Sequence, residues 1–133
     1  MGYTRYPPSI LMVADNSPQT LKVKQILENN GCQVYWIETY FDYLARASQT
    51  YFDLIVLDIE KPDEDSLEMY KKLKDCPKLA DIPIVILTTH NDPGETINGS
   101  KTSPAYVLTK DPGAGLKLLQ IMEQVHYMTY RYL

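Results

Sequence analysis

The sequence has few cysteines, no excess of positive charge and no long apolar run, and each shortage excludes a class of protein. Its two cysteines, Cys32 and Cys76, are far apart and match no zinc or redox spacing. The net charge of −4 argues against a nucleic-acid-binding surface, which needs a basic patch. No apolar run approaches the roughly 20 residues of a membrane-spanning helix, and the N-terminus lacks the apolar centre of a signal peptide. We therefore expect a cytoplasmic protein with two free thiols and with neither nucleic acid nor a membrane as partner.

A single domain is the simplest organisation for this chain. Its 133 residues, 44% of them hydrophobic, suffice for one packed core. Pro7 and Pro8 block regular structure near the start, so residues 1–9 are predicted to form an N-terminal arm and residues 10–133 the domain.

Short apolar runs alternate with helical patterns along the whole chain. The predicted strands span residues 10–13, 33–38, 51–58, 82–87 and 105–109. The first predicted helix starts at Pro18, is capped by Ser17 and ends at Gly31. Two more cover residues 39–50 and 65–75, and the last one starts at Asp111 and Pro112. Residues 90–104, which contain two prolines and two glycines, predict an irregular fourth helix. Five such alternations demand an α/β fold, with a parallel sheet, right-handed crossovers and helices on both faces.

The helical patterns also predict which side chains face the core. The expected inward residues are Leu21, Val23 or Lys24, Ile26 and Leu27 in the first helix, Leu67, Tyr70 and Leu73 in the third, and Leu116, Leu119, Met122 and Val125 in the last.

Four of the predicted strands end at a residue able to do chemistry. These residues are Asp15, Asp58, Thr88 and Lys110. Because the carboxyl ends of parallel strands share one edge of the sheet, we expect the four to meet in a shallow cleft. Two carboxylates and a backbone carbonyl suit Mg²⁺, a lysine suits a phosphate oxygen, and a hydroxyl adds a hydrogen bond. This set is what transfer of a phosphoryl group onto a carboxylate requires.

Four motifs follow these strands at matching spacing: V-A-D-N-S-P, L-D-I-E-K-P-D-E-D-S, I-L-T-T and V-L-T-K-D-P. Together they make the chain, from about residue 10 to 124, resemble the receiver domain of two-component response regulators. The resemblance implies a flavodoxin-like sheet with strand order 2-1-3-4-5. It also implies a signalling switch rather than an enzyme, with at most slow autodephosphorylation.

The resemblance assigns a role to each residue of the cleft. Asp58 is the expected phosphoacceptor, served by a histidine kinase or a phosphotransfer protein. Asp15, Asp58 and the backbone carbonyl of Glu60 are the expected Mg²⁺ ligands. Thr88 is expected to bind a phosphoryl oxygen, and Lys110 to pair first with the acceptor and then with the phosphate.

The chain departs from the receiver pattern at two positions near this cleft. Receivers carry two adjacent acids after the first strand, whereas Asp15 stands between Ala14 and Asn16, so one acid is missing on either alignment. The usual switch aromatic is replaced by Val107, and its neighbour Tyr106 is expected to point to the opposite face of its strand. These departures motivate an alternative: a degenerate receiver that binds a protein partner independently of phosphorylation.

Two further alternatives have weaker support. The D-x-E at Asp58 and Glu60 faintly resembles the motif of aspartate-nucleophile phosphatases, and a flavin site would need a better phosphate loop than N-S-P-Q-T.

The aromatic residues of the last helix, such as Tyr127 and Tyr130, predict packing, or a contact in a homodimer or with a neighbouring domain.

Overall fold

The structure, a computed structural model, describes residues 7–14, 17–37, 45, 51–59, 64–89 and 105–130; for residues 64–67, 69, 105 and 126–130 it describes the backbone alone. The elements in chain order are β1 (Ser9–Val13), α1 (Pro18–Asn29), β2 (Gln33–Ile37), β3 (Leu54–Asp58), α3 (Glu64–Asp75), β4 (Ile84–Thr88), β5 (Ala105–Thr109) and α5 (Ala114–Tyr130). The predicted helix over residues 39–50, apart from the helical Ala45, and the irregular helix over residues 90–104 lie outside the described residues.

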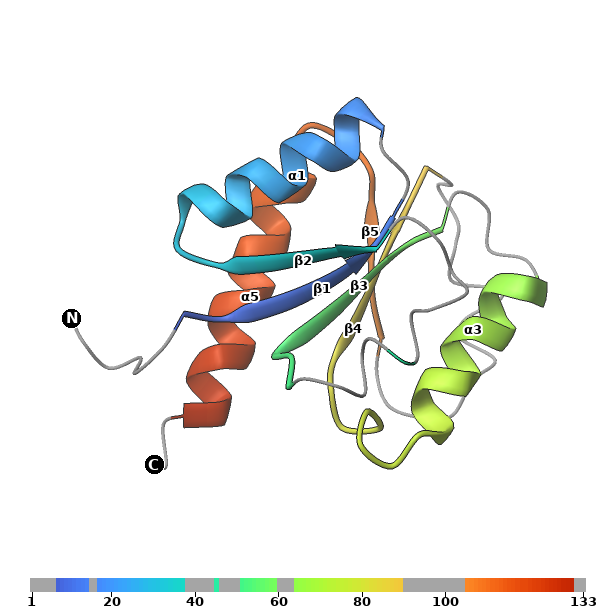
Figure 1. Ribbon diagram of the computed structural model, residues 1–133. Helices are drawn as coiled ribbons and strands as arrows, with labels where there is room; N and C mark the ends of the chain where they lie inside the picture. The colour runs from blue at the N-terminus through green and yellow to red at the C-terminus, as the bar shows by residue number, and fades with distance from the viewer. Residues whose placement is uncertain are drawn as a thin grey trace.

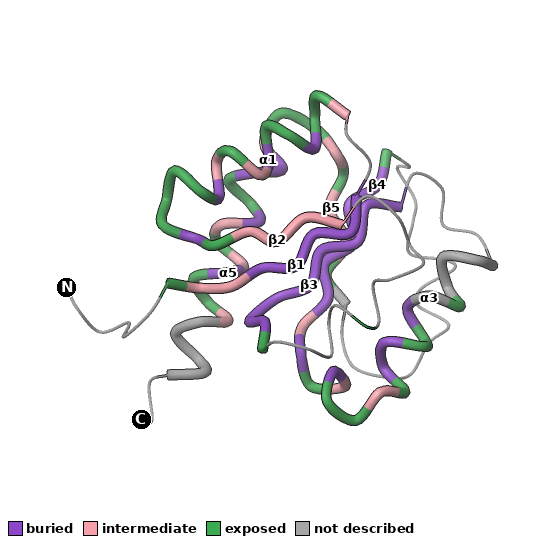
Figure 2. The backbone as a smooth tube through the Cα atoms, in the orientation of Figure 1, coloured by how far each residue is buried: buried purple, intermediate pink, exposed green. Residues whose placement is uncertain are grey.

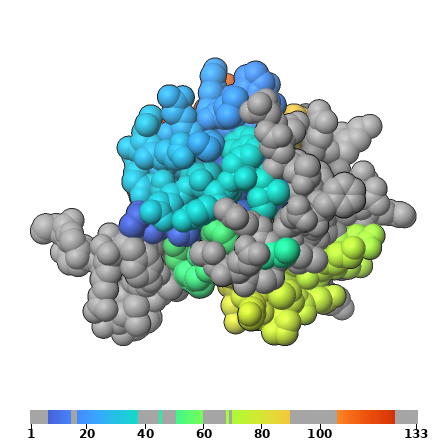
Figure 3. Space-filling view, viewed as in Figure 1, coloured from blue at the N-terminus to red at the C-terminus, as the bar shows by residue number. Residues whose placement is uncertain are grey.

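The five strands form one parallel sheet in the order β2-β1-β3-β4-β5, as expected. Figure 1 shows α1 and α5 together on one face of this sheet and α3 on the other. In the space-filling view, α1 and β2 form a continuous outer surface (Figure 3). The predicted α/β architecture, with helices on both faces, is confirmed. Within the described part of the chain, no helix combines the length and the apolar character that crossing a membrane requires.

The central strands are buried on both faces, which explains their unbroken apolar runs. Every residue of β3 and β4 is buried (Figure 2). Because side chains alternate along a strand, Ile55 and Leu57 join the core on the α3 side, whereas Leu54 and Val56 join the core under α1 and α5. The middle of the sheet is therefore a rigid support for whatever follows β3 and β4.

Helix α1 begins and ends where the sequence predicts. Ser17 caps it, with the Ser17 hydroxyl accepting from the Thr20 backbone N–H at 3.3 Å, and Pro18 is its first residue. Gly31, just past the helix, has φ of 91°, a left-handed conformation that glycine adopts without strain. The inward stripe, however, runs through Val23 and Leu27, while Leu21 is 44% exposed. The prediction for Leu21 was wrong.

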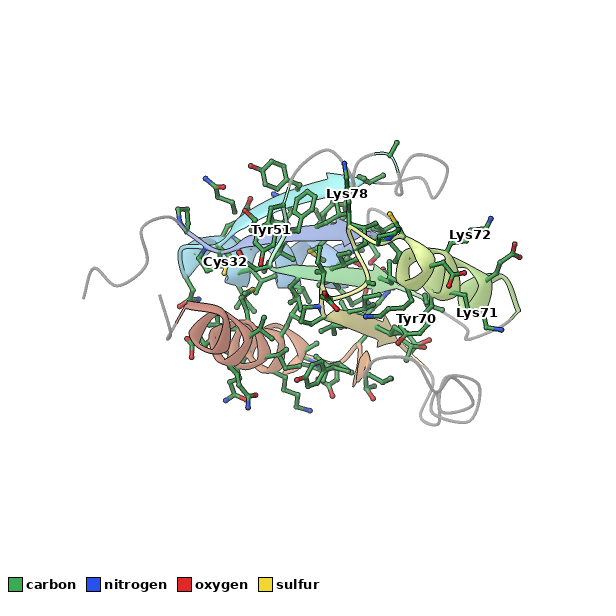
Figure 4. The ribbon with its side chains drawn as sticks, turned by 90° about the horizontal axis from the view of Figure 1, so that it is seen from below. Cys32, Tyr51, Tyr70, Lys71, Lys72 and Lys78 are labelled. Carbon is green, nitrogen blue, oxygen red and sulfur yellow. The ribbon has the colours of Figure 1, made fainter. Side chains whose placement is uncertain are left out.

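Helix α3 uses the predicted apolar stripe. Tyr70 and Leu73 are buried against the sheet, whereas Lys71 and Lys72 are exposed. Figure 4 shows Tyr70 on the sheet side of the helix and the two lysines on its outer sides. The third predicted member, Leu67, belongs to the residues whose side chains are not described.

The buried face of α5 agrees with the predicted one except at its first residue. Leu116 is 59% exposed, but Met122 is buried as predicted, and Leu119 and Val125 are partly buried and pack against the same core. Ala114 and Leu118 are buried there as well. A helix turns by about 100° per residue, so residues four apart stay nearly in line, whereas residues three apart drift by about 60° at each step. The predicted series advances by threes, so it starts at Leu116 on the outer face and rotates toward the sheet; only the prediction for Leu116 was wrong.

Both cysteines are free thiols, as expected, but their surroundings differ. Cys32 is buried under α1 and α5, and Cys76 is only partly buried. Burial, followed by the negative charges of Glu123 and Asp53, raises the pKa of the Cys32 thiol from 9.0 to about 11. Since the thiolate is the reactive form, Cys32 should be the less reactive thiol at neutral pH.

Cys32 is expected to react with iodoacetamide at pH 8 at least tenfold more slowly than Cys76. A thiol with a pKa of about 11 carries only about one thiolate in a thousand at this pH, and burial restricts access further. Mass spectrometry of the Cys32→Ala and Cys76→Ala variants would follow each thiol alone, with the rate for Cys32 rising as the pH approaches 11. In denaturant, the two thiols should react at equal rates. Equal rates for Cys32 and Cys76 in the folded protein would contradict the burial of Cys32.

Candidate functional site

Asp58 lies at the centre of the carboxyl edge of the sheet. It is the last residue of β3, the middle strand, and it is paired in register with Leu87 of β4. The backbone N–H of Ile59 donates to the Leu87 carbonyl at 2.8 Å, which holds the chain in the sheet one residue further. Asp58 is only 4% exposed, although a carboxylate is costly to bury without partners. Its carboxylate oxygens must therefore have hydrogen-bond or ionic partners within the protein.

Lys110 supplies the compensating charge. It follows β5 directly, and its backbone N–H donates to the Thr88 carbonyl at 2.7 Å. From there its ammonium reaches across β4 to Asp58, with 2.6 Å between Lys110 Nζ and Asp58 Oδ1. The two side chains are 7% and 3% exposed, so the attraction is screened far less than in a surface pair. The structure thus brings together two of the predicted site residues.

Thr88 ends β4 at the same edge of the sheet and is fully buried. Alternation along β4 places its side chain on the α3 side, together with Ile84 and Ile86. Val107 of β5 packs into the same cluster, while Tyr106 is 38% exposed. Val107, which stands where receivers carry the switch aromatic, is therefore an aliphatic residue on the same face of the sheet as Thr88, as expected from the sequence.

Thr20 completes the surroundings of Asp58, although no motif in the sequence marks it as a site residue. Its hydroxyl donates to Asp58 Oδ2 at 3.0 Å, and it is fully buried in the first turn of α1. The Ser17 hydroxyl is hydrogen-bonded in turn to the Thr20 hydroxyl. One signal was available: Thr20 lies three residues before Val23 and seven before Leu27, which makes it the polar end of the buried stripe of α1.

The side of the site where the sequence predicts Mg²⁺ is described only in part. Ala14, directly after β1, is fully buried and offers no side-chain oxygen. Asp15, Asn16 and Glu60 lie outside the described residues, and within the described ranges no cluster of three or more acidic, histidine or cysteine side chains could hold a metal. Among the described residues, the Asp58 carboxylate supplies hard oxygens, the kind of ligand that Mg²⁺ prefers. A site formed with Asp15 and the Glu60 carbonyl fits that chemistry.

Chemically, the described site is a buried carboxylate held between a cation and a hydroxyl. A carboxylate oxygen is a nucleophile for phosphorus, and a lysine beside it can transfer its contact to an oxygen of the incoming phosphoryl group. Catalysis of phosphoryl transfer depends on this kind of positioning and charge stabilisation rather than on covalent chemistry by the protein. The geometry therefore suits a phosphoryl acceptor.

Comparison with known sequences agrees with this geometry. The family model of the response regulator receiver domain matches residues 10–125. The phosphate regulon transcriptional regulatory protein PhoB of Klebsiella pneumoniae is 33% identical over 101 residues, which cover 76% of this chain and 44% of PhoB. The chain thus spans less than half the length of this curated relative.

Solved structures lead to the same family. The chemotaxis response regulator CheY4 of Vibrio cholerae is 27% identical, with a TM-score of 0.71, over 87% of this chain and 98% of that one. The receiver domain of a Pseudomonas aeruginosa sensor histidine kinase, which has a magnesium ion coordinated in its active-site cleft, shares the fold with a TM-score of 0.72 at 20% identity, over 89% of this chain and 96% of that one. This chain belongs to the response regulator receiver domains, the signalling modules of two-component systems.

Proposed function

We propose that this chain accepts a phosphoryl group on Asp58 from a histidine kinase or a phosphotransfer protein and signals by a change in conformation. The observation that carries the proposal is the buried pair of Asp58 and Lys110, 2.6 Å apart at the carboxyl edge of the sheet. A buried ion pair contributes little to net stability compared with apolar packing, so a pair at this edge favours a functional role.

In the proposed reaction, Asp58 Oδ1 attacks the phosphorus of a phosphohistidine. The new O–P bond forms as the N–P bond breaks, and the electron pair of that bond returns to the imidazole. Lys110 moves its contact from Oδ1 to a phosphoryl oxygen, and Thr88 donates its hydroxyl to another. Mg²⁺, held by Asp15, Asp58 and the Glu60 carbonyl, would neutralise charge on the phosphoryl oxygens.

The proposal includes the setting of the domain. The predicted division into an arm, residues 1–9, and a receiver, residues 10–133, needs one change, because Ser9 already belongs to β1. The protein would work in the cytoplasm, where its kinase partner would present the phosphohistidine. It acts as a switch whose phosphoryl group is lost slowly, rather than as an enzyme with turnover. Helix α5 would contact a second copy or a neighbouring domain, and neither nucleic acid nor a membrane is a partner of this domain.

A degenerate receiver is the second candidate, favoured by one observation. Ala14 is fully buried beside the acceptor edge and carries no ligand atom, so the site lacks a carboxylate if Ala14 takes the place of the first acid. Such a module would bind its partner through the fold alone. An affinity for the partner that is identical for wild type and Asp58→Asn would support this candidate.

Labelling with a small phosphodonor tests the leading proposal. Wild-type protein, incubated with acetyl phosphate and Mg²⁺, is expected to gain one phosphoryl group on Asp58 by intact mass and peptide mapping, and to gain none in EDTA. Asp58→Asn should abolish labelling, whereas Asp111→Asn, an exposed aspartate next to Lys110, should not. A folded wild-type protein that stays unlabelled with both acetyl phosphate and a competent kinase would disprove the proposal.

A further inference from the structure

We infer that Thr20 is a positioning residue for the acceptor, and that its hydroxyl shortens the lifetime of the phosphoryl group on Asp58. The inference rests on the proposed function. It starts from the contact between the Thr20 hydroxyl and Asp58 Oδ2 at 3.0 Å, which joins two fully or nearly fully buried side chains from α1 and β3. Lys110 holds the other oxygen, Oδ1, so the carboxylate is fixed from both sides.

Hydrogen bonds at the start of α1 form a chain that ends on the Asp58 carboxylate. The Thr20 backbone N–H donates to the Ser17 hydroxyl, and the Thr20 hydroxyl donates its single proton to Asp58. In the remaining contact, between the two hydroxyls, Ser17 must then be the donor. Each bond in such a chain polarises the next, which strengthens the final hydrogen bond to the charged oxygen.

The hydrogen bond from Thr20 to Asp58 Oδ2 is stronger before phosphorylation than after it. Unphosphorylated, Asp58 Oδ2 belongs to an anionic carboxylate, and a hydrogen bond to an ionised acceptor is about twice as strong as a neutral one. When Oδ1 bonds to phosphorus, Oδ2 becomes the carbonyl oxygen of an acyl phosphate and loses its formal charge. Thr20 therefore stabilises the free acceptor relative to the phosphorylated one.

The same difference acts on the hydrolysis step. Water attacks the phosphorus, the O–P bond to Asp58 breaks, and its electron pair returns to the carboxylate as inorganic phosphate leaves. Negative charge grows on the leaving carboxylate in the transition state, and Thr20 is already placed to donate to it. A preorganised donor aimed at developing charge lowers a barrier, so Thr20 should accelerate the loss of phosphate.

Thr20→Val tests the inference, because valine keeps the shape of threonine and removes the hydroxyl. After labelling with acetyl phosphate and removal of the donor, the half-life of phosphorylated Thr20→Val is expected to be about fivefold longer than that of wild type, as about half the strength of a charged hydrogen bond is lost in the transition state. Thr20→Ser should restore the wild-type half-life. Thr109→Val, the same substitution at an exposed threonine, should leave it unchanged.

Binding of beryllofluoride gives a second reading without phosphoryl turnover. This group attaches to a carboxylate oxygen as a mimic of the phosphoryl group, so calorimetry with Mg²⁺ and beryllofluoride should show several-fold tighter binding to Thr20→Val than to wild type. If valine prevents folding, Thr20→Ala removes the hydroxyl without adding bulk and serves in both measurements.

The outcomes separate the inference from the proposed function. A longer half-life in Thr20→Val, with rescue by Thr20→Ser, supports the inference, because a purely structural role would not lengthen a lifetime. An unchanged or shorter half-life in Thr20→Val, with normal labelling of Asp58 in wild type, overturns the inference alone. A wild-type protein that cannot be labelled overturns both.

Discussion

Lys110→Met is expected to slow phosphorylation of Asp58 by at least 100-fold and to lower the free energy of unfolding by about 3 kcal/mol. The kinetic loss follows from removing a charged donor at the reacting group, which typically costs two to three orders of magnitude in rate. The loss of stability follows because methionine leaves the 3%-exposed Asp58 carboxylate without the cation at Oδ1. Breaking one side of a buried pair costs about 3–5 kcal/mol, far more than the pair itself contributes.

Lys117→Met is the matched control for this experiment. Lys117 also pairs with an aspartate, Asp111, but at 3.8 Å and with side chains 57% and 40% exposed, so its loss should leave both labelling and stability nearly unchanged. Urea unfolding and phosphodonor labelling would be measured on all variants. The double variant Asp58→Asn/Lys110→Met should be more stable than Lys110→Met alone, because the unpaired charge is gone. Equal stability of wild type and Lys110→Met would contradict the burial of this pair.

Restoring the missing acid is expected to tighten Mg²⁺ binding by one to two orders of magnitude. Hard-cation affinity rises with the number of charged ligands, and a new carboxylate within about 4 Å of a divalent ion adds a strong attraction even at the effective dielectric of a protein surface. If Ala14 occupies the position of the first acid, Ala14→Asp produces this gain. If Asn16 occupies the position of the second acid, Asn16→Asp produces the gain instead.

The comparison of these two variants decides the alignment. Calorimetric dissociation constants for Mg²⁺ would be measured on both, with Ala14→Asn as the uncharged control. Ala14 is fully buried, so Ala14→Asp should be less stable than wild type in EDTA and should recover stability in Mg²⁺. If neither acid tightens Mg²⁺ binding, the region around Asp15 is not a metal site, and the degenerate receiver becomes the better description.

The site around Asp58 was predictable where it depends on residues at the ends of strands. Asp58, Thr88 and Lys110 each follow an apolar run, and parallel strands bring all their carboxyl ends to one edge. The contact between Asp58 and Lys110 needed no knowledge of helix packing, because one strand lies between β3 and β5 and a lysine side chain is long enough to cross it. Asp15 and Glu60 remain predictions from the sequence.

Thr20 was not predictable in the same way. The S-P-Q-T turn predicts a helix cap, and the cap is present, but a first-turn threonine usually bonds within its own helix or to water. Whether it reaches Asp58 depends on how α1 lies against the end of β3. That placement follows from the packing of Val23 and Leu27 on the sheet, not from any local motif.

The order of apolar runs, helix caps and strand-end residues was enough to specify a parallel α/β sheet with a buried aspartate at its carboxyl edge, because these are local patterns with a fixed geometric meaning. The packing of helices on that sheet decided the rest: that Leu118 of α5 is inward and Leu116 exposed, and that the Thr20 hydroxyl meets Asp58. Such choices depend on contacts between residues distant in sequence, here 38 positions from Thr20 to Asp58. Only the folded chain brings those residues within hydrogen-bonding distance.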